Sequence, residues 1–70
     1  MSELIFLVEE SMEGGYIAEA LGHSIYTEGD NIEELKKNIM DALKCHFDDS
    51  ELAPKIIRLH YVKDEILSYA

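Results

Sequence analysis

The sequence has few cysteine, proline or tryptophan residues. It contains one cysteine, Cys45, one proline, Pro54, and no tryptophan. A lone cysteine forms no disulfide within the chain, so we expect a reducing compartment and a cytoplasmic protein. The first segment, MSELIFLVEE, lacks a basic start, and its apolar run is too short for a signal peptide or a membrane span. No membrane partner is therefore expected.

Positive charge is also scarce. Fifteen acidic residues face six basic ones, which gives a formal net charge of −9. Such a surface repels phosphate backbones, so direct binding of nucleic acid is not expected, whereas a basic protein partner is favoured. The alternative is that the excess of acid only keeps a small protein in solution.

The 70 residues are enough for one domain, residues 1–70, and 47% of them are hydrophobic. A chain of this length buries only about 60% of the surface that it exposes when unfolded. Since no disulfide is available, oligomerisation is the expected source of extra stability.

Three strand-like segments open the chain, at residues 4–10, 16–21 and 25–28, with Gly14-Gly15 and Gly22 in the turns between them. They predict a three-stranded antiparallel meander. In the first strand, Leu4, Phe6 and Val8 alternate with Ile5 and Leu7, so both faces are apolar. One face can meet a helix, and the other needs a second cover.

A helix is predicted after Asn31, running to about Phe47. Asn31 and Glu34 have the spacing of a capping box, and apolar residues recur every three or four positions. A loop follows at residues 48–50, and a fourth strand is predicted at residues 56–62. Residues 63–70 continue that strand or turn helical. The fold class is α+β, in two layers, with the order β-β-β-α-β.

Two strings, EGGYIAEA at residues 13–20 and SIYTEGDNIEEL at residues 24–35, resemble the HicB-like antitoxin family. Asn31 stands where that family usually has Thr or Ser. The resemblance covers residues 3–47 and implies a trimmed ribonuclease H-like fold without its active site. It also implies a toxin–antitoxin role, in which the domain covers a small basic toxin that cleaves mRNA. Many family members carry a DNA-binding domain that this short form lacks after Val62, so autorepression is not expected.

Residues able to carry chemistry are present but poorly arranged. A two-metal nuclease site needs several converging carboxylates, and the fourth strand adds none to Glu9 or Glu10, Glu19 and Asp41. The cysteine and the histidines lack the paired spacing of metal ligands, and the adjacent Cys45 and His46 cannot face each other on a helix. Those histidines are His23, His46 and His60. We therefore predict no enzyme activity, no metal, no cofactor, and a buried or half-buried Cys45.

The remaining hypothesis is a protein-binding domain. The candidate interface residues are apolar or aromatic and lie on the exposed strand face, in the strands and in the final segment: Ile5, Leu7, Tyr16, Tyr61, Ile66, Leu67 and Tyr69. The expected partners are a second copy of the chain, as a homodimer or higher oligomer, and a small basic toxin. The alternative is an orphan homo-oligomeric regulatory or structural protein that has no toxin.

Overall fold

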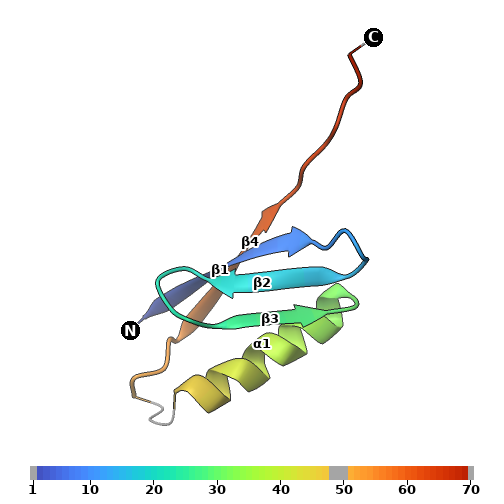
Figure 1. Cartoon of the computed structure of the whole chain (residues 1–70). Coiled ribbons are helices and arrows are strands. Elements are labelled where there is room, and N and C mark those ends of the chain that lie inside the picture. Colours follow the sequence, from blue (N-terminus) through green and yellow to red (C-terminus); the bar gives the residue numbers. More distant parts are fainter. Residues whose placement is uncertain (1, 48–50, 70) are drawn as a thin grey trace.

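The computed structural model describes residues 2–47 and 51–69; the predicted loop at residues 48–50 and the final residue of the 63–70 segment lie outside the described residues. The elements follow the predicted order β-β-β-α-β (Figure 1). Their bounds are β1 Glu3–Glu10, β2 Tyr16–Ala20, β3 Tyr26–Gly29, α1 Ile32–His46 and β4 Ile56–Val62. The predicted α+β class and the two layers are confirmed.

The four strands form one mixed sheet in the order β3-β2-β1-β4. The first three strands make the predicted antiparallel meander, and β4 returns after the helix to pair in parallel with β1. The register places Phe6 between Ala20 on one side and Leu59 on the other. Strand β4 is therefore an edge strand, next to the most apolar strand of the sheet.

The core lies between the sheet and α1. Alternation along β1 buries Leu4, Phe6 and Val8 on the helix side, while Ile5 and Leu7 are half-buried on the opposite face. From α1, the stripe of Leu35, Ile39 and Leu43 completes the core. The predicted two-faced character of the first strand is thus confirmed.

The start of α1 is fixed by side-chain capping. The Asn31 Oδ1 atom accepts a hydrogen bond from the Glu34 backbone N–H at 2.8 Å, and Glu34 Oε2 accepts one from the Asp30 N–H at 3.2 Å. The first bond satisfies a donor that the first helical turn leaves without a partner, and the second joins that turn to the residue before the cap. The predicted cap at Asn31 is confirmed.

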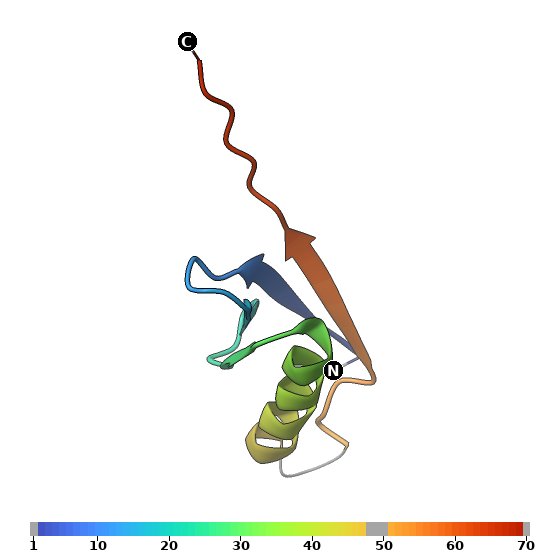
Figure 2. The same ribbon diagram turned by 90° about the vertical axis from the view of Figure 1, so that its right-hand side faces the viewer.

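The helix covers only part of the sheet. The backbone of α1 lies against β3 and β2, and within the described residues it does not approach that of β4 closely. Figure 2 shows that α1 and β4 run in diverging directions. Strand β4 lies at the opposite edge of the sheet from β3. A helix about 10 Å across cannot span four strands spaced about 4.8 Å apart. The helix-facing side of β4 is consequently left partly open.

Residues 63–69 form neither a strand nor a helix. They continue from the end of β4 as an extended arm that projects away from the domain (Figures 1 and 2). The two conformations expected for this segment, a longer strand and a helical turn, are therefore both wrong. The last pair between β1 and β4 is Glu9 with Val62, and β1 ends one residue later, so no described strand runs beside residues 64–69.

Candidate protein-interaction surface

The helix-facing side chains of β4 are placed by their register with β1. Ile57, Leu59 and Tyr61 lie opposite the core residues of β1, so they point toward the helix layer. Because α1 lies under the other strands, Ile57 and Leu59 are only half-buried and Tyr61 is 52% exposed. The core therefore continues into a surface that its own helix does not cover.

Two hollows mark this surface. One, of about 300 Å³, is lined by Met40, Leu43, Phe47, Ala53, Pro54 and Ile57, with Lys44 and Lys55 beside them. The other, of about 240 Å³, is lined by Val8, Glu10, Tyr16, Ile32, Tyr61, Val62 and Lys63. They lie near opposite ends of α1, one beside Phe47 and the other beside Ile32, and we call the two hollows together the α1–β4 groove.

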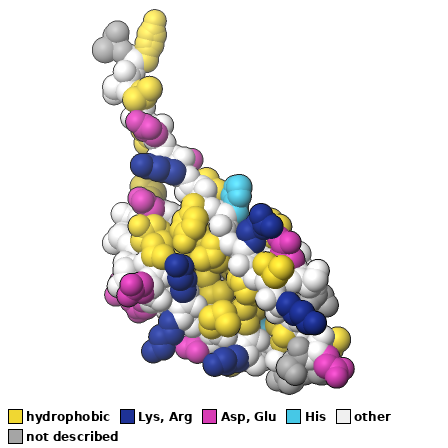
Figure 3. Space-filling model, turned by 180° about the vertical axis from the view of Figure 1, so that it is seen from behind, with side chains coloured by type: hydrophobic (Ala, Val, Ile, Leu, Met, Phe, Trp, Pro, Cys, Tyr) yellow, Lys and Arg dark blue, Asp and Glu magenta, His cyan; other side chains and the backbone are white. Residues whose placement is uncertain are grey.

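The groove is apolar in the middle and basic at its border. Seen from behind, hydrophobic side chains gather in a patch on this face, and Lys and Arg side chains lie around it (Figure 3). Among the charged residues that line the two hollows, Glu10 is acidic, and the others are Lys44, Lys55 and Lys63. These are three of only six basic residues in a chain with a net charge of −9. The groove is thus suited to an acidic and apolar segment, which sets it apart from the rest of the surface.

The arm, residues 63–69, carries the large apolar side chains with the highest exposed fractions in the described chain apart from Met12. Ile66 is 93% exposed, Leu67 83% and Tyr69 93%. Two acidic residues, Asp64 and Glu65, precede them. Three of the predicted interface residues are therefore brought together on one projecting segment.

A separate hollow on the other side of the helix is acidic. It has a volume of about 400 Å³ and is lined by Ser11, Glu13, Gly14, Tyr16, Glu28, Gly29, Asp30, Glu34 and Asn38. Four of these described residues are carboxylates and none is Lys or Arg. Asn38 Nδ2 donates a hydrogen bond to the Glu28 carbonyl oxygen at 2.7 Å, which ties α1 to the outer edge of β3.

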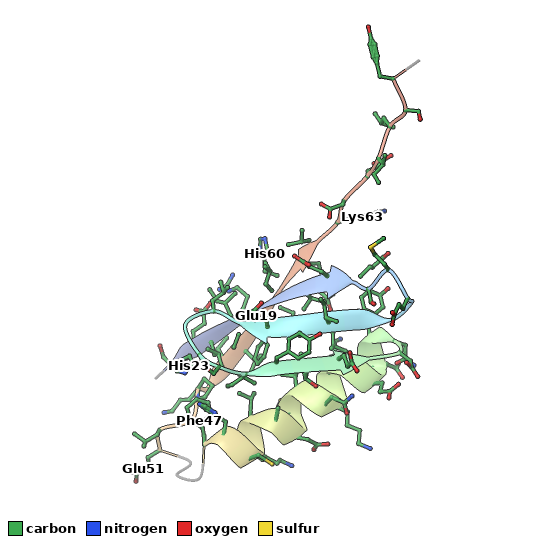
Figure 4. All side chains as sticks on the ribbon, viewed as in Figure 1. Glu19, His23, Phe47, Glu51, His60 and Lys63 are labelled. Carbon is green, nitrogen blue, oxygen red and sulfur yellow. The ribbon has the colours of Figure 1, made fainter. Side chains whose placement is uncertain are left out.

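The other predicted interface residues are dispersed. Tyr16 is half-buried and packs against the core, so it acts mainly as a packing residue at the wall of two hollows. Ile5 and Leu7 lie on the sheet face opposite the helix. There Leu7 is flanked by Glu19 of β2 and His60 of β4, both of which point away from the helix (Figure 4). That face is a mixture of apolar and charged side chains.

The residues considered for chemistry do not converge. Glu9 and Glu19 lie on the open face of the sheet, whereas Asp41 is exposed on α1, beyond the other face. In the described part of the chain, no group of three or more His, Cys, Asp or Glu residues is arranged to hold a metal ion. His23 and His46 do lie near each other, at 6.0 Å between ring centroids, packed edge to face.

The prediction that Cys45 is buried or half-buried is wrong, because its thiol is exposed. Cys45 follows Leu43 by two residues, which turns it about 200° around the helix, away from the buried stripe. The spacing of the apolar residues in that stripe is therefore enough to predict an exposed Cys45.

Sequence reasoning missed the groove residues on α1 and in the loop before β4, namely Met40, Lys44 and Lys55. Alternation in residues 57–61 did indicate an apolar face on the fourth strand. What the pattern lacked was any sign that the helix would sit under β2 and β3. Met40 is half-exposed at the border of the helical stripe, a position that periodicity alone assigns to solvent.

The fold and these surfaces define a small two-layer α+β domain with substantial apolar surface outside its core. No family model matches the chain, and no solved structure matches it significantly. A UPF0150 protein of Thermotoga maritima is 48% identical over 62 residues, which cover 89% of this chain and 86% of that protein. A UPF0150 protein of Archaeoglobus fulgidus is 53% identical over 53 residues, covering 76% and 77%. The chain belongs to the UPF0150 family.

That family name states no activity or ligand. No helix in the described part of the chain is long and apolar enough to cross a membrane.

Proposed function

We propose that the chain is a protein-binding domain of the HicB antitoxin type, which binds and neutralises a small basic toxin that cleaves mRNA. The observation that carries this proposal is the acidic hollow beside α1. Four carboxylates, from Glu13, Glu28, Asp30 and Glu34, line one open concavity. A positively charged partner is attracted to such a concentration of negative charge, and the approach is steered over distances near the Debye length.

The proposal is also supported by the sequence pattern. Gly29, in one of the strings that resemble HicB, lines the same hollow; Gly15 approaches Gly29 closely, and Asn31 caps the start of α1. These residues place the carboxylates of the β1–β2 turn and of the first helical turn next to one another. The domain itself would have no catalytic role, and localisation in the cytoplasm belongs to the same proposal.

The test uses any small basic protein that is encoded next to the gene for this chain. Co-expression is expected to yield one complex by sedimentation velocity, and the complex should lose the RNA cleavage shown by the basic protein alone. The double variant Glu13→Lys/Glu28→Lys is expected to weaken binding at least about tenfold, because it places two cations against a basic partner.

A matched control is Glu19→Lys/Asp41→Lys, which makes the same change in charge at exposed positions outside the hollow. Equal weakening by both double variants would show that only net charge matters and would count against a site in the hollow. If no small basic protein is encoded beside the gene, or if that protein forms no complex with this chain, the antitoxin role is wrong.

The alternative function is a homo-oligomeric regulatory or structural protein without a toxin. A specific observation favours self-association in either case. The half-buried Ile5 and Leu7, the open α1–β4 groove and the arm all leave apolar surface in water on a chain whose core is small. Burying such surface contributes about 25 cal/mol per Å² to association.

A further inference from the structure

We infer that the arm of one copy, residues 63–69, binds in the α1–β4 groove of a second copy, so that two chains exchange arms in a two-fold dimer. The inference rests on the proposal that the chain functions by binding protein, and it identifies the occupant of the groove. It concerns a surface distinct from the acidic hollow.

The chemistry of the two parts is complementary. The arm presents Ile66, Leu67 and Tyr69 with almost no cover from their own chain. The groove presents half-open apolar side chains, with Met40 at 50% and Tyr61 at 52% exposure. Both parts expose apolar side chains to water, and contact between them would remove both apolar surfaces from water.

Charge discriminates between possible occupants. The arm carries Asp64 and Glu65 immediately before its apolar residues. Lys44 and Lys55 line the hollow into which the apolar residues would fit. In a chain of net charge −9, a basic rim around an apolar patch repels a basic toxin and attracts an acidic segment. The arm is the acidic and apolar segment that the chain itself provides.

The lengths also agree. Seven extended residues reach at most about 23 Å, and a 15-residue helix such as α1 is about 22 Å long. The arm is therefore long enough to extend along the whole groove. It leaves β4 in a direction away from its own groove (Figures 1 and 2). Occupying its own groove would require a sharp reversal next to Lys63, whereas a second copy receives it without one.

The area involved is sufficient for a specific dimer. Burying one aromatic side chain such as Tyr69 removes on the order of 150 Å² or more from water. Three arm side chains and the groove that receives them, counted twice in a two-fold pair, approach the roughly 1,600 Å² of a standard interface. A self-complementary patch that serves both copies is the commonest way to close such a pair.

Sedimentation equilibrium of the full chain at tens of micromolar tests the pairing, without any other protein present. The wild type is expected to sediment as a dimer of a chain of 8.0 kDa. Leu67→Asp/Tyr69→Asp in the arm and Met40→Asp in the groove should each raise the dissociation constant at least about tenfold. The matched control, Leu21→Asp/Tyr26→Asp, removes one Leu and one Tyr that are also exposed but lie outside both parts. It should leave the dimer intact.

A disulfide test then locates the arm. In a Cys45→Ser background, a chain with Leu67→Cys is mixed with a chain with Met40→Cys under mild oxidation, and mass spectrometry identifies the products. The inference requires a cross-linked pair that contains one chain of each kind. Replacing Met40→Cys by Leu21→Cys should reduce that product strongly.

A charge exchange adds a third readout. Lys44→Glu/Lys55→Glu should weaken the dimer, and combining it with Asp64→Lys/Glu65→Lys should restore it. A monomeric wild type overturns the inference, as does a dimer that withstands the arm variants or that is lost only with Leu21→Asp/Tyr26→Asp. If the arm exchange is wrong, the proposed binding of a basic protein is not affected, because its test uses different residues.

Discussion

Gly15 occupies a turn position that no other residue fits. Its φ is +79°, and a Cβ atom there would lie 2.6 Å from the Gly29 carbonyl oxygen. Gly14, the preceding residue, has φ of +98° but open space around the corresponding position. At both positions a residue with a Cβ atom would be strained by the left-handed backbone, and the positions differ only in steric contact.

Gly14→Ala and Gly15→Ala should accordingly differ in stability. The first is expected to lose about 1–2 kcal/mol of unfolding free energy from backbone strain alone. The second should lose about 1–3 kcal/mol more, because the turn must separate from the end of β3. Urea unfolding followed by circular dichroism measures both. Equal losses would mean that the turn relaxes freely away from Gly29.

At the scale of the element, the start of α1 depends on a single side-chain oxygen. Asn31→Ala is expected to cost about 1 kcal/mol, because the Glu34 N–H loses its acceptor. Asn31→Ser should cost only a few tenths, since a hydroxyl can accept the same bond. Thermal and urea unfolding of the two variants checks the order, and a serine variant as unstable as the alanine variant would contradict it.

The elements could be predicted from the sequence, but their placement could not. Turn glycines, strand alternation and the cap at Asn31 give all five elements to within a residue or two. Alternation shows which side chains share a face, and it does not show which strands a helix covers. That choice depends on how closely α1 packs on each strand, as where Gly29 of β3 meets Leu35 and an added Cβ would lie 2.5 Å from the Leu35 nitrogen. The groove and the free arm follow from that placement.

At the scale of the whole molecule, charge dominates the expected behaviour toward nucleic acid. A net charge of −9 repels a phosphate backbone, although several basic side chains gather around one patch (Figure 3). At physiological salt, micromolar protein is expected neither to retard a short DNA duplex in a gel nor to cut it when magnesium is present. A shifted band that weakens steeply with added salt would contradict this, and so would cleavage abolished by Glu19→Gln.

The two edges of the sheet differ in a way that bears on polymerisation. At β3, the Asn38 side chain donates to the Glu28 carbonyl oxygen and α1 packs alongside, whereas no helix among the described residues packs against β4 at the other edge. A sheet with two open edges can recruit further chains without limit and grow into a fibre. A sheet with one blocked edge can be extended only once, after which two chains present their closed sides outward. Growth by strand addition is therefore self-terminating, and fibre formation would first require α1 to detach from β3.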